Sequence, residues 1–207
     1  MFINFFFSEL RYSLRQPMIY LFFGIVFLLV FAANVTDNVT IGGSIGNVYR
    51  NGPHIITTFT IILTLFGLLF AAAFFNNSAL RDHKHNFQEI LYSTPIDKFG
   101  YYIGKFSASL FLSTIPLLGV YFGLILGSKI APLMGWIQAD RFGPFYIETF
   151  INNYFLFILP NMFIGGAIIY SLAQEFKSTM ISFVGAMLIL MGYTLASELS
   201  SDIDNET

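Results

Sequence analysis

Five long runs without a charged residue most strongly limit what this chain can fold into. The runs contain 21, 30, 23, 26 and 20 residues, and they lie at 16–36, 51–80, 106–128, 149–174 and 178–197. A helix needs about 20 mostly apolar residues to cross a bilayer, because its backbone groups must bond within their own segment. We therefore predict an all-α, polytopic helical membrane protein that forms a single domain over residues 1–207, with spans near 17–33, 55–75, 103–127, 149–173 and 179–196.

The composition points to the same class of protein. Hydrophobic residues make up 56% of the chain and charged residues 11%, whereas roughly a quarter of the residues of a soluble domain are charged. The formal net charge is −2, so the chain has no basic surface for a nucleic-acid backbone, and we exclude nucleic acid as a partner. The chain has no cysteine, which excludes disulfides and cysteine-based metal sites.

The Lys and Arg residues between the spans predict the orientation of the chain in the membrane. With a cytoplasmic N-terminus, three of them lie outside (Arg50, Lys129 and Arg141) and seven lie inside (Arg11, Arg15, Arg81, Lys84, Lys98, Lys105 and Lys177). This bias favours the N-terminus inside. Five spans then place the tail 198–207, which has four carboxylates and no Lys or Arg, on the outer face.

The segment 1–16 before the first span has the pattern of an amphipathic helix. Its apolar stripe contains Ile3, Phe6, Phe7, Leu10 and Leu14, and its polar stripe contains Asn4, Ser8, Arg11 and Arg15. We expect this helix to lie on the membrane, with lipid as its partner. A secretory signal peptide is the alternative, but the apolar run is too long for one.

The sequence predicts no catalytic residue, cofactor or metal site. A phosphate-binding P-loop requires a glycine five residues before its Gly-Lys pair, and Phe99 stands there before Gly104-Lys105. No H-E-x-x-H zinc-protease motif is present, and His83-x-His85 places its two rings on different sides of a helix. Lys105 is the one charged residue within a predicted span, and we expect it to snorkel to the interface. Because ion-coupled transporters carry charges inside the membrane, any transport would be powered by another chain.

The segment Arg81–Lys105 between spans two and three contains a second amphipathic pattern. One stripe contains Leu80, His83, Phe87, Ile90 and Leu91, and the opposite stripe contains Arg81, His85, Gln88 and Glu89. Thr94 as N-cap, Pro95 at the first position and Asp97 at the third then predict a new helix. The first helix either rests on lipid headgroups or docks a partner protein.

Glycines and prolines within the spans predict how the helices pack and bend. Gly119, Gly123 and Gly127 repeat at a spacing of four on one face of the third span, which predicts close helix packing. The partner helix could belong to the same chain or to a second copy. Pro116 and Pro160 are expected to kink spans three and four.

Several of these motifs together resemble the type 2 exporter permeases of ATP-binding-cassette transporters. Glu89-Ile-Leu-Tyr-Ser-Thr-Pro95-Ile-Asp-Lys98, followed by Gly104-Lys105, is similar to the coupling-helix segment of that family. The outer segment Asp37-Asn38-Val-Thr-Ile41-Gly42-Gly43, with Asn51-Gly-Pro53, is closer to bacterial permeases, often from Bacteroidetes, that continue into a zinc aminopeptidase.

The resemblance implies a transmembrane subunit in the bacterial inner (plasma) membrane, with an ATP-binding-cassette ATPase and a second permease half, identical or different, as partners. The ATPase-coupling residues would be Arg81, Phe87, Glu89, Ile90, Leu91 and Pro95. Because the family has six spans and this chain has five, we expect the permease to be incomplete at residue 207, with a sixth span and any peptidase beyond it. The alternative function is a non-transport membrane anchor or assembly protein, and a secondary transporter ranks third.

Overall fold

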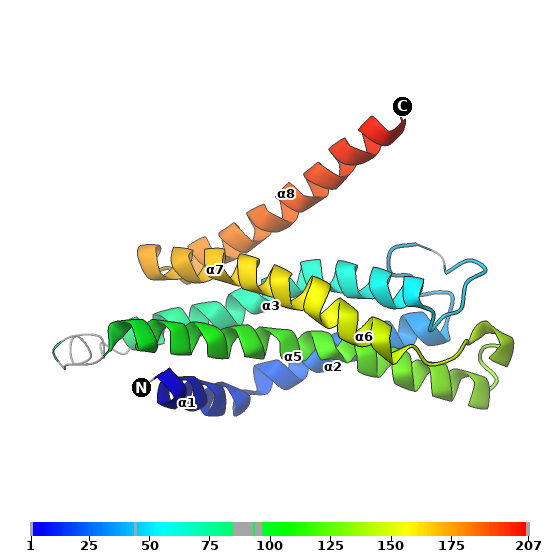
Figure 1. Cartoon of the computed structure of the whole chain (residues 1–207), viewed down its shortest axis with the longest axis horizontal. Helices are drawn as coiled ribbons and strands as arrows, with labels where there is room; N and C mark the ends of the chain where they lie inside the picture. Colours follow the sequence, from blue (N-terminus) through cyan, green and yellow to red (C-terminus); the bar gives the residue numbers. More distant parts are fainter. Residues whose placement is uncertain (1, 44, 85–92, 94–96, 206–207) are drawn as a thin grey trace.

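The computed structural model describes residues 2–43, 45–84, 93 and 97–205, with side chains up to residue 196. The described residues form helices and connecting loops, without a strand (Figure 1). The elements are α1 (Phe2–Leu14), α2 (Pro17–Val35), α3 (Pro53–Lys84), α5 (Lys98–Leu133), the 3₁₀ turn η1 (Ala139–Arg141), α6 (Ile147–Asn153), the π-helical segment η2 (Tyr154–Ile158), α7 (Leu159–Phe176) and α8 (Thr179–Asn205).

Among the described residues, five helical stretches are long and apolar enough to cross a membrane, as the sequence predicts. They are Pro17–Val35, Pro53–Lys84, Lys98–Leu133, Ile147–Phe176 and Thr179–Ala196. The polytopic all-helical fold is therefore confirmed. α3 and α5 extend well past the predicted spans 55–75 and 103–127. Polar turns follow the apolar run of α3 and precede that of α5, and these turns continue the same two helices.

α5 lies at the centre of the bundle and contacts α1, α2, α3 and α7 (Figure 1). α7 also packs on α3, and α8 contacts α7 and α3 through its first turns before it diverges from the other helices. Every side chain from Met191 to Ala196 is exposed. The core is therefore formed mainly by α2, α3, α5 and α7.

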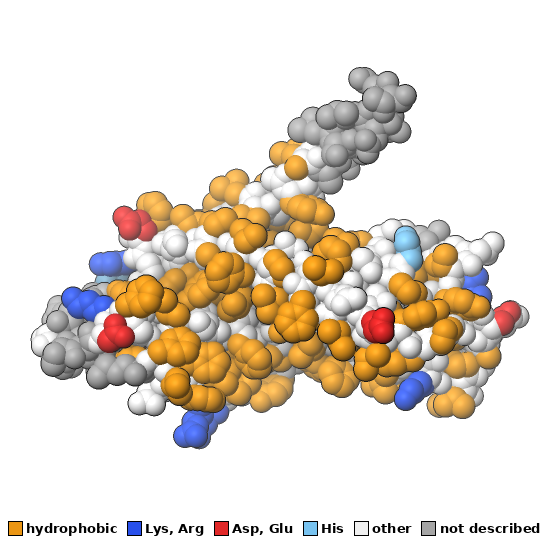
Figure 2. Space-filling model, in the orientation of Figure 1, with side chains coloured by type: hydrophobic (Ala, Val, Ile, Leu, Met, Phe, Trp, Pro, Cys, Tyr) orange, Lys and Arg blue, Asp and Glu red, His pale blue; other side chains and the backbone are white. Residues whose placement is uncertain are grey.

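Figure 2 shows hydrophobic side chains over the middle of the visible face and charged side chains gathered toward its two ends. We name these ends by the segments they carry. The basal end contains the C-terminus of α3 and the N-terminus of α5, and the distal end contains the loops 36–52 and 134–146. A charge-free middle with polar ends is the distribution expected of a bundle that spans a bilayer.

The starts and ends of the helices follow local sequence signals. Pro17 occupies the first turn of α2, and extended backbone at Gln16 separates α2 from α1. Lys177 adopts the left-handed conformation (φ 50°) and ends α7 two residues before α8. α5 begins at Lys98 with Asp97 as its N-cap, so the prediction of Asp97 at the third helical position is wrong. Thr94 and Pro95, the other residues of that signal, lie outside the described residues.

The two prolines predicted to bend the spans lie in different surroundings. Pro116 is buried inside α5, which continues as one helix from Lys98 to Leu133. Pro160 lies in the first turn of α7, directly after the π-helical segment η2. Because Pro160 has no N–H to donate and its ring crowds the preceding turn, a wider turn just before it is physically reasonable.

Candidate functional site

Lys105 is buried at the basal end between α5 and α3. Its Nζ donates to the carbonyl oxygen of Ser78 at 3.0 Å and to Oδ2 of Asp82 at 2.5 Å, and it lies 4.9 Å from the centre of the Tyr101 ring. The expectation that Lys105 snorkels to the interface is therefore wrong. The reason is that α3 continues past its apolar run and places the Asp82 carboxylate within reach of the ammonium group.

A second ion pair joins α1 to α3 at the same end. Arg81 donates through Nη1 and Nη2 to the two carboxylate oxygens of Glu9, at 3.1 and 2.5 Å. The Arg81 guanidinium also lies 4.3 Å from the centre of the Tyr12 ring. Only 1% of the Glu9 side chain is exposed, against 21% of the Arg81 side chain. This two-point pairing links α1 to α3, in addition to the packing of α1 on α5.

The two ion pairs are adjacent, because Arg81 and Asp82 follow each other in α3. Arg81 pairs with α1, and Asp82 pairs with α5. The four groups have no net charge, and each buried charge has an opposite partner. Burial of ionised groups is tolerated under these conditions, but removal of one partner leaves an uncompensated charge.

Neutral hydrogen bonds connect the same end of α3 to the remaining helices. Asn76 donates to the carbonyl of Thr179 at the start of α8, at 3.1 Å. Gln174 of α7 donates to the carbonyl of Ala79 at 3.4 Å, and Asn77 donates to Gln16, between α1 and α2, at 3.3 Å. The last two turns of α3 therefore bond to every other long helix or to its connecting segment. We call residues 76–82 of α3, with these partners, the α3 hub.

Of the predicted ATPase-coupling residues, Arg81 lies in the α3 hub, where it pairs with Glu9. Phe87, Glu89, Ile90, Leu91 and Pro95 lie outside the described residues. Their role stays a prediction. The segment that contains them begins directly after the α3 hub and ends at α5, whose Lys105 is bonded back to the hub.

The glycine face of α5 packs on α2 of the same chain. A Cβ at Gly119 would lie 2.9 Å from the Phe23 carbonyl oxygen, and one at Gly123 would lie 2.9 Å from that of Phe27. At Gly127 it would meet the Asn34 side chain at 2.7 Å. The two backbones are thus close enough to exclude any larger residue at these positions. Since α2 covers this face, no second copy is required to explain the glycine spacing.

At the distal end, Arg50 is a buried cation that sequence reasoning treated only as a loop charge. Its Nη1 donates to the carbonyl oxygens of Ala33, Asn34 and Thr36 at 3.5, 3.1 and 3.3 Å, and its Nη2 pairs with Asp37. It therefore caps the C-terminus of α2, where orphan carbonyls favour a cation. No local pattern marked this role.

Asn51, next to Arg50, joins the two distal loops. Its side-chain amide donates to the Gly143 carbonyl at 2.8 Å and accepts from the Gly143 N–H at 2.7 Å. Arg50 N–H donates to the carbonyl of Arg141 at 2.9 Å, and the Arg141 side chain donates to Gly46. The distal loops are therefore held by backbone-directed hydrogen bonds.

Among the residues that the structure describes, no group of three or more His, Cys, Asp or Glu is placed to hold a metal ion. Comparison with protein-family models, curated proteins and solved structures found no match to this chain. The resemblance to a transporter family therefore rests on the sequence motifs alone.

Proposed function

We propose that this chain is the transmembrane permease subunit of an ATP-binding-cassette exporter, in which a separate ATPase subunit drives substrate movement across the membrane. The proposal places it in the bacterial inner membrane with the N-terminus and the basal end in the cytoplasm. A second permease half, identical or different, would complete the translocation unit. The observation that carries the proposal is the α3 hub.

An ATPase that pushes on a permease needs a contact segment whose movement reaches all the helices. The segment 85–97 connects α3 to α5, and the Asp82–Lys105 ion pair links these helices across its base. A force on the segment is therefore delivered to α3 and α5 together. The Glu9–Arg81 pair carries the movement to α1, and the bonds of Asn76 and Gln174 carry it to α8 and α7.

The distribution of charge supports an external source of energy. Transporters driven by an ion gradient have ionisable residues within the membrane that gain and lose their ions during transport. In the described spans the buried charges lie at the two ends, and each is paired with an opposite charge. Between these ends, the described spans contain no Asp, Glu, His, Lys or Arg side chain.

The proposal is tested by purifying the tagged full chain from its native membrane and identifying the ATPase that accompanies it. We expect Glu89→Lys to lose this ATPase or its coupled turnover, because the variant reverses a charge in the proposed contact segment. Lys129→Glu, a charge reversal on α5 near the distal end, is the matched control and should retain both. Both variants should insert in the membrane normally. If the same amount of ATPase accompanied Glu89→Lys with the same coupled turnover, the membrane-anchor function would be favoured. The absence of an accompanying ATPase in the wild type would favour it as well.

A further inference from the structure

α1 has three faces rather than the two stripes that its sequence suggests. Glu9 and Ser13 are buried against the bundle. Ile3 and Phe7 form an exposed apolar face. The third face is exposed and polar, and it contains Asn4, Ser8, Arg11 and Arg15. These three environments match protein, the apolar part of a membrane and the headgroup layer, respectively.

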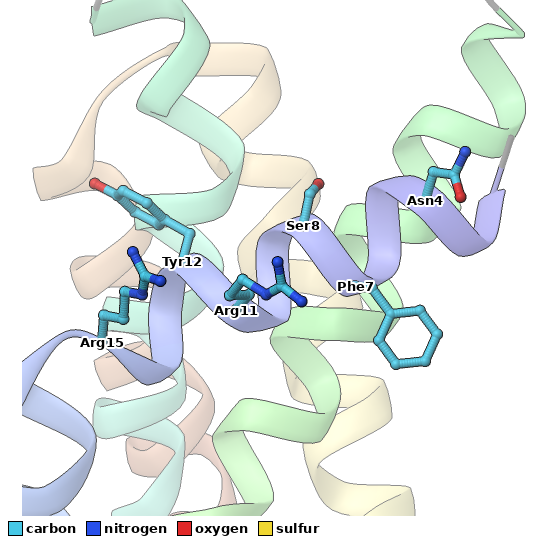
Figure 3. Close-up of a pocket in the computed structure, with 6 residues that line it drawn as sticks. All are labelled: Asn4, Phe7, Ser8, Arg11, Tyr12 and Arg15. Carbon is cyan, nitrogen blue, oxygen red and sulfur yellow. The ribbon is translucent and has the colours of Figure 1, made fainter.

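The polar face lines a shallow hollow on the side of α1 that points away from the bundle (Figure 3). Its lining residues are Asn4, Phe7, Ser8, Arg11, Tyr12 and Arg15. Figure 3 shows that the six side chains come from α1 and, for Arg15, from the residue directly after it, with Arg15 beside Tyr12 and Arg11 beside Ser8 along the helix. Arg11 and Arg15 are exposed and one helical turn apart, so one phosphate group placed between them can accept hydrogen bonds from both guanidinium groups.

The charge of the hollow is unbalanced. Arg11 and Arg15 are one helical turn apart, and within the described chain neither forms an ion pair. The nearest acid on the helix, Glu9, faces the bundle and is engaged by Arg81. Like charges at a spacing of four repel each other and destabilise a helix. An anion bound between the two guanidinium groups would remove this repulsion.

Exposed apolar side chains lie on α1 and on the helix that follows it, α2. Phe7 borders the hollow, and the Tyr20 hydroxyl donates to the Leu14 carbonyl at 3.1 Å, so the exposed Tyr20 side chain covers the junction of α1 and α2. Beyond it, Leu21, Ile25 and Leu28 are exposed along α2. A phosphate at the hollow would therefore have room for acyl chains beside it. A free phosphate would make no use of this surface.

We infer that α1 carries a binding site for the headgroup phosphate of an anionic phospholipid, with Arg11 and Arg15 as its charge-pairing residues and the Tyr12 hydroxyl as a further donor. Lipid bound there joins the membrane surface to α1, and the Glu9–Arg81 pair joins α1 to the bundle. The inference does not depend on the transport proposal, because a membrane anchor would use the same site.

The test measures lipid binding to the full chain in an uncharged detergent, by native mass spectrometry and by the rise in melting temperature. Phosphatidylglycerol is the probe, and phosphatidylcholine and glycerol phosphate are the comparisons. We expect phosphatidylglycerol to bind and to stabilise the wild type more than either comparison does. Two basic residues near an anionic headgroup contribute about 2 kcal/mol to the free energy of lipid binding. Arg11→Gln/Arg15→Gln should therefore bind phosphatidylglycerol about thirtyfold more weakly.

Lys129→Gln/Lys177→Gln removes two exposed positive charges elsewhere and should bind phosphatidylglycerol as the wild type does. Equal binding of phosphatidylglycerol and phosphatidylcholine by the wild type would overturn the inference without the use of any variant. Wild-type affinity in Arg11→Gln/Arg15→Gln would overturn it as well. If glycerol phosphate bound as tightly as phosphatidylglycerol, the site would recognise a free phosphate and the assignment to lipid would be wrong.

Discussion

Lys105 at the basal end and Arg50 at the distal end are both buried cations with one acidic partner, but their surroundings differ. Lys105 has one carbonyl acceptor besides Asp82, whose side chain is 20% exposed. Arg50 has three carbonyl acceptors at the end of α2 besides Asp37, whose side chain is 84% exposed. The basal cation therefore depends on its carboxylate, whereas the distal cation depends on the backbone.

The difference has a mechanical consequence. A cation held by the carbonyls at the end of its neighbouring helix stabilises a fixed cap, because those carbonyls move only with α2. A cation held by a side chain of another helix adds a polar link between two helices, so a displacement of one helix is resisted by the other. Lys105 and Arg81 make such links from α3 to α5 and to α1. The distal end is thus built to hold its loops, and the basal end is built to connect helices.

The largest expected effect is at the basal end. Asp82→Asn leaves the Lys105 ammonium buried without a counter-charge, which should cost about 3–5 kcal/mol in the free energy of unfolding. Lys105→Met should cost less, because the remaining Asp82 is partly exposed and can be hydrated. The melting temperatures of the two variants in detergent give the order directly. If Asp82→Asn melted at a higher temperature than Lys105→Met, the dependence of Lys105 on the Asp82 carboxylate would be contradicted.

The seam between α2 and α5 connects the two ends, because α2 carries the carbonyl acceptors of Arg50 and α5 carries Lys105. Gly123→Leu should separate the helices at this seam and cost about 3 kcal/mol or more, since its Cβ would meet backbone atoms of α2. Gly24→Leu is the matched control, because a Cβ at Gly24 meets nothing within 4 Å. Similar melting temperatures for the two variants would show that the helices do not pack closely there.

At the distal end, Asn51→Ala should have an intermediate effect. It removes the two hydrogen bonds to Gly143 that join the distal loops, which should cost about 1–2 kcal/mol. Asn47→Ala, in the same loop on an exposed residue, should cost less than 0.5 kcal/mol, roughly the limit for such surface changes. Proteolysis of the loop 36–52 should be faster in Asn51→Ala than in Asn47→Ala, and equal rates would argue against the link between the loops.

The smallest effect is expected for Asp37→Asn, which removes the acidic partner of a buried cation as Asp82→Asn does. Because Asp37 is exposed and Arg50 keeps its three carbonyl acceptors, the cost should be about 0–1 kcal/mol. The pair of Asp→Asn variants therefore compares the two ends by the same chemical change. A destabilisation of Asp37→Asn as large as that of Asp82→Asn would remove the distinction between them.

The sequence predicted the five spans correctly because hydrocarbon imposes the same length and apolarity on every crossing helix. It also predicted the close approach at Gly119, Gly123 and Gly127, since a spacing of four places small residues on one helical face. The partner helix could not be predicted, because spacing within α5 contains no information about α2.

The α3 hub could not be predicted from local patterns. Glu9 and Arg81 are 72 residues apart, and Lys105 and Asp82 are 23 apart, so no helical wheel brings them together. The charge of Lys105 near a span end suggested snorkelling, which holds only when no carboxylate lies nearer than the headgroups. A weak signal was present, since Arg81 and Asp82 are adjacent opposite charges that directly follow an uncharged run.

Under the proposed function, a force that the ATPase exerts on the segment 85–97 reaches the other helices through the α3 hub. This transmission is tested most directly by the ATP turnover of the complete complex in lipid nanodiscs with the double variant Asp82→Asn/Lys105→Met, in which both charges of one pair are removed and neither is left uncompensated. We expect the variant still to bind the ATPase but substrate no longer to stimulate ATP turnover, whereas Asp37→Asn should behave as the wild type. Substrate-stimulated turnover at the wild-type level in the double variant would show that the Asp82–Lys105 pair does not transmit the force.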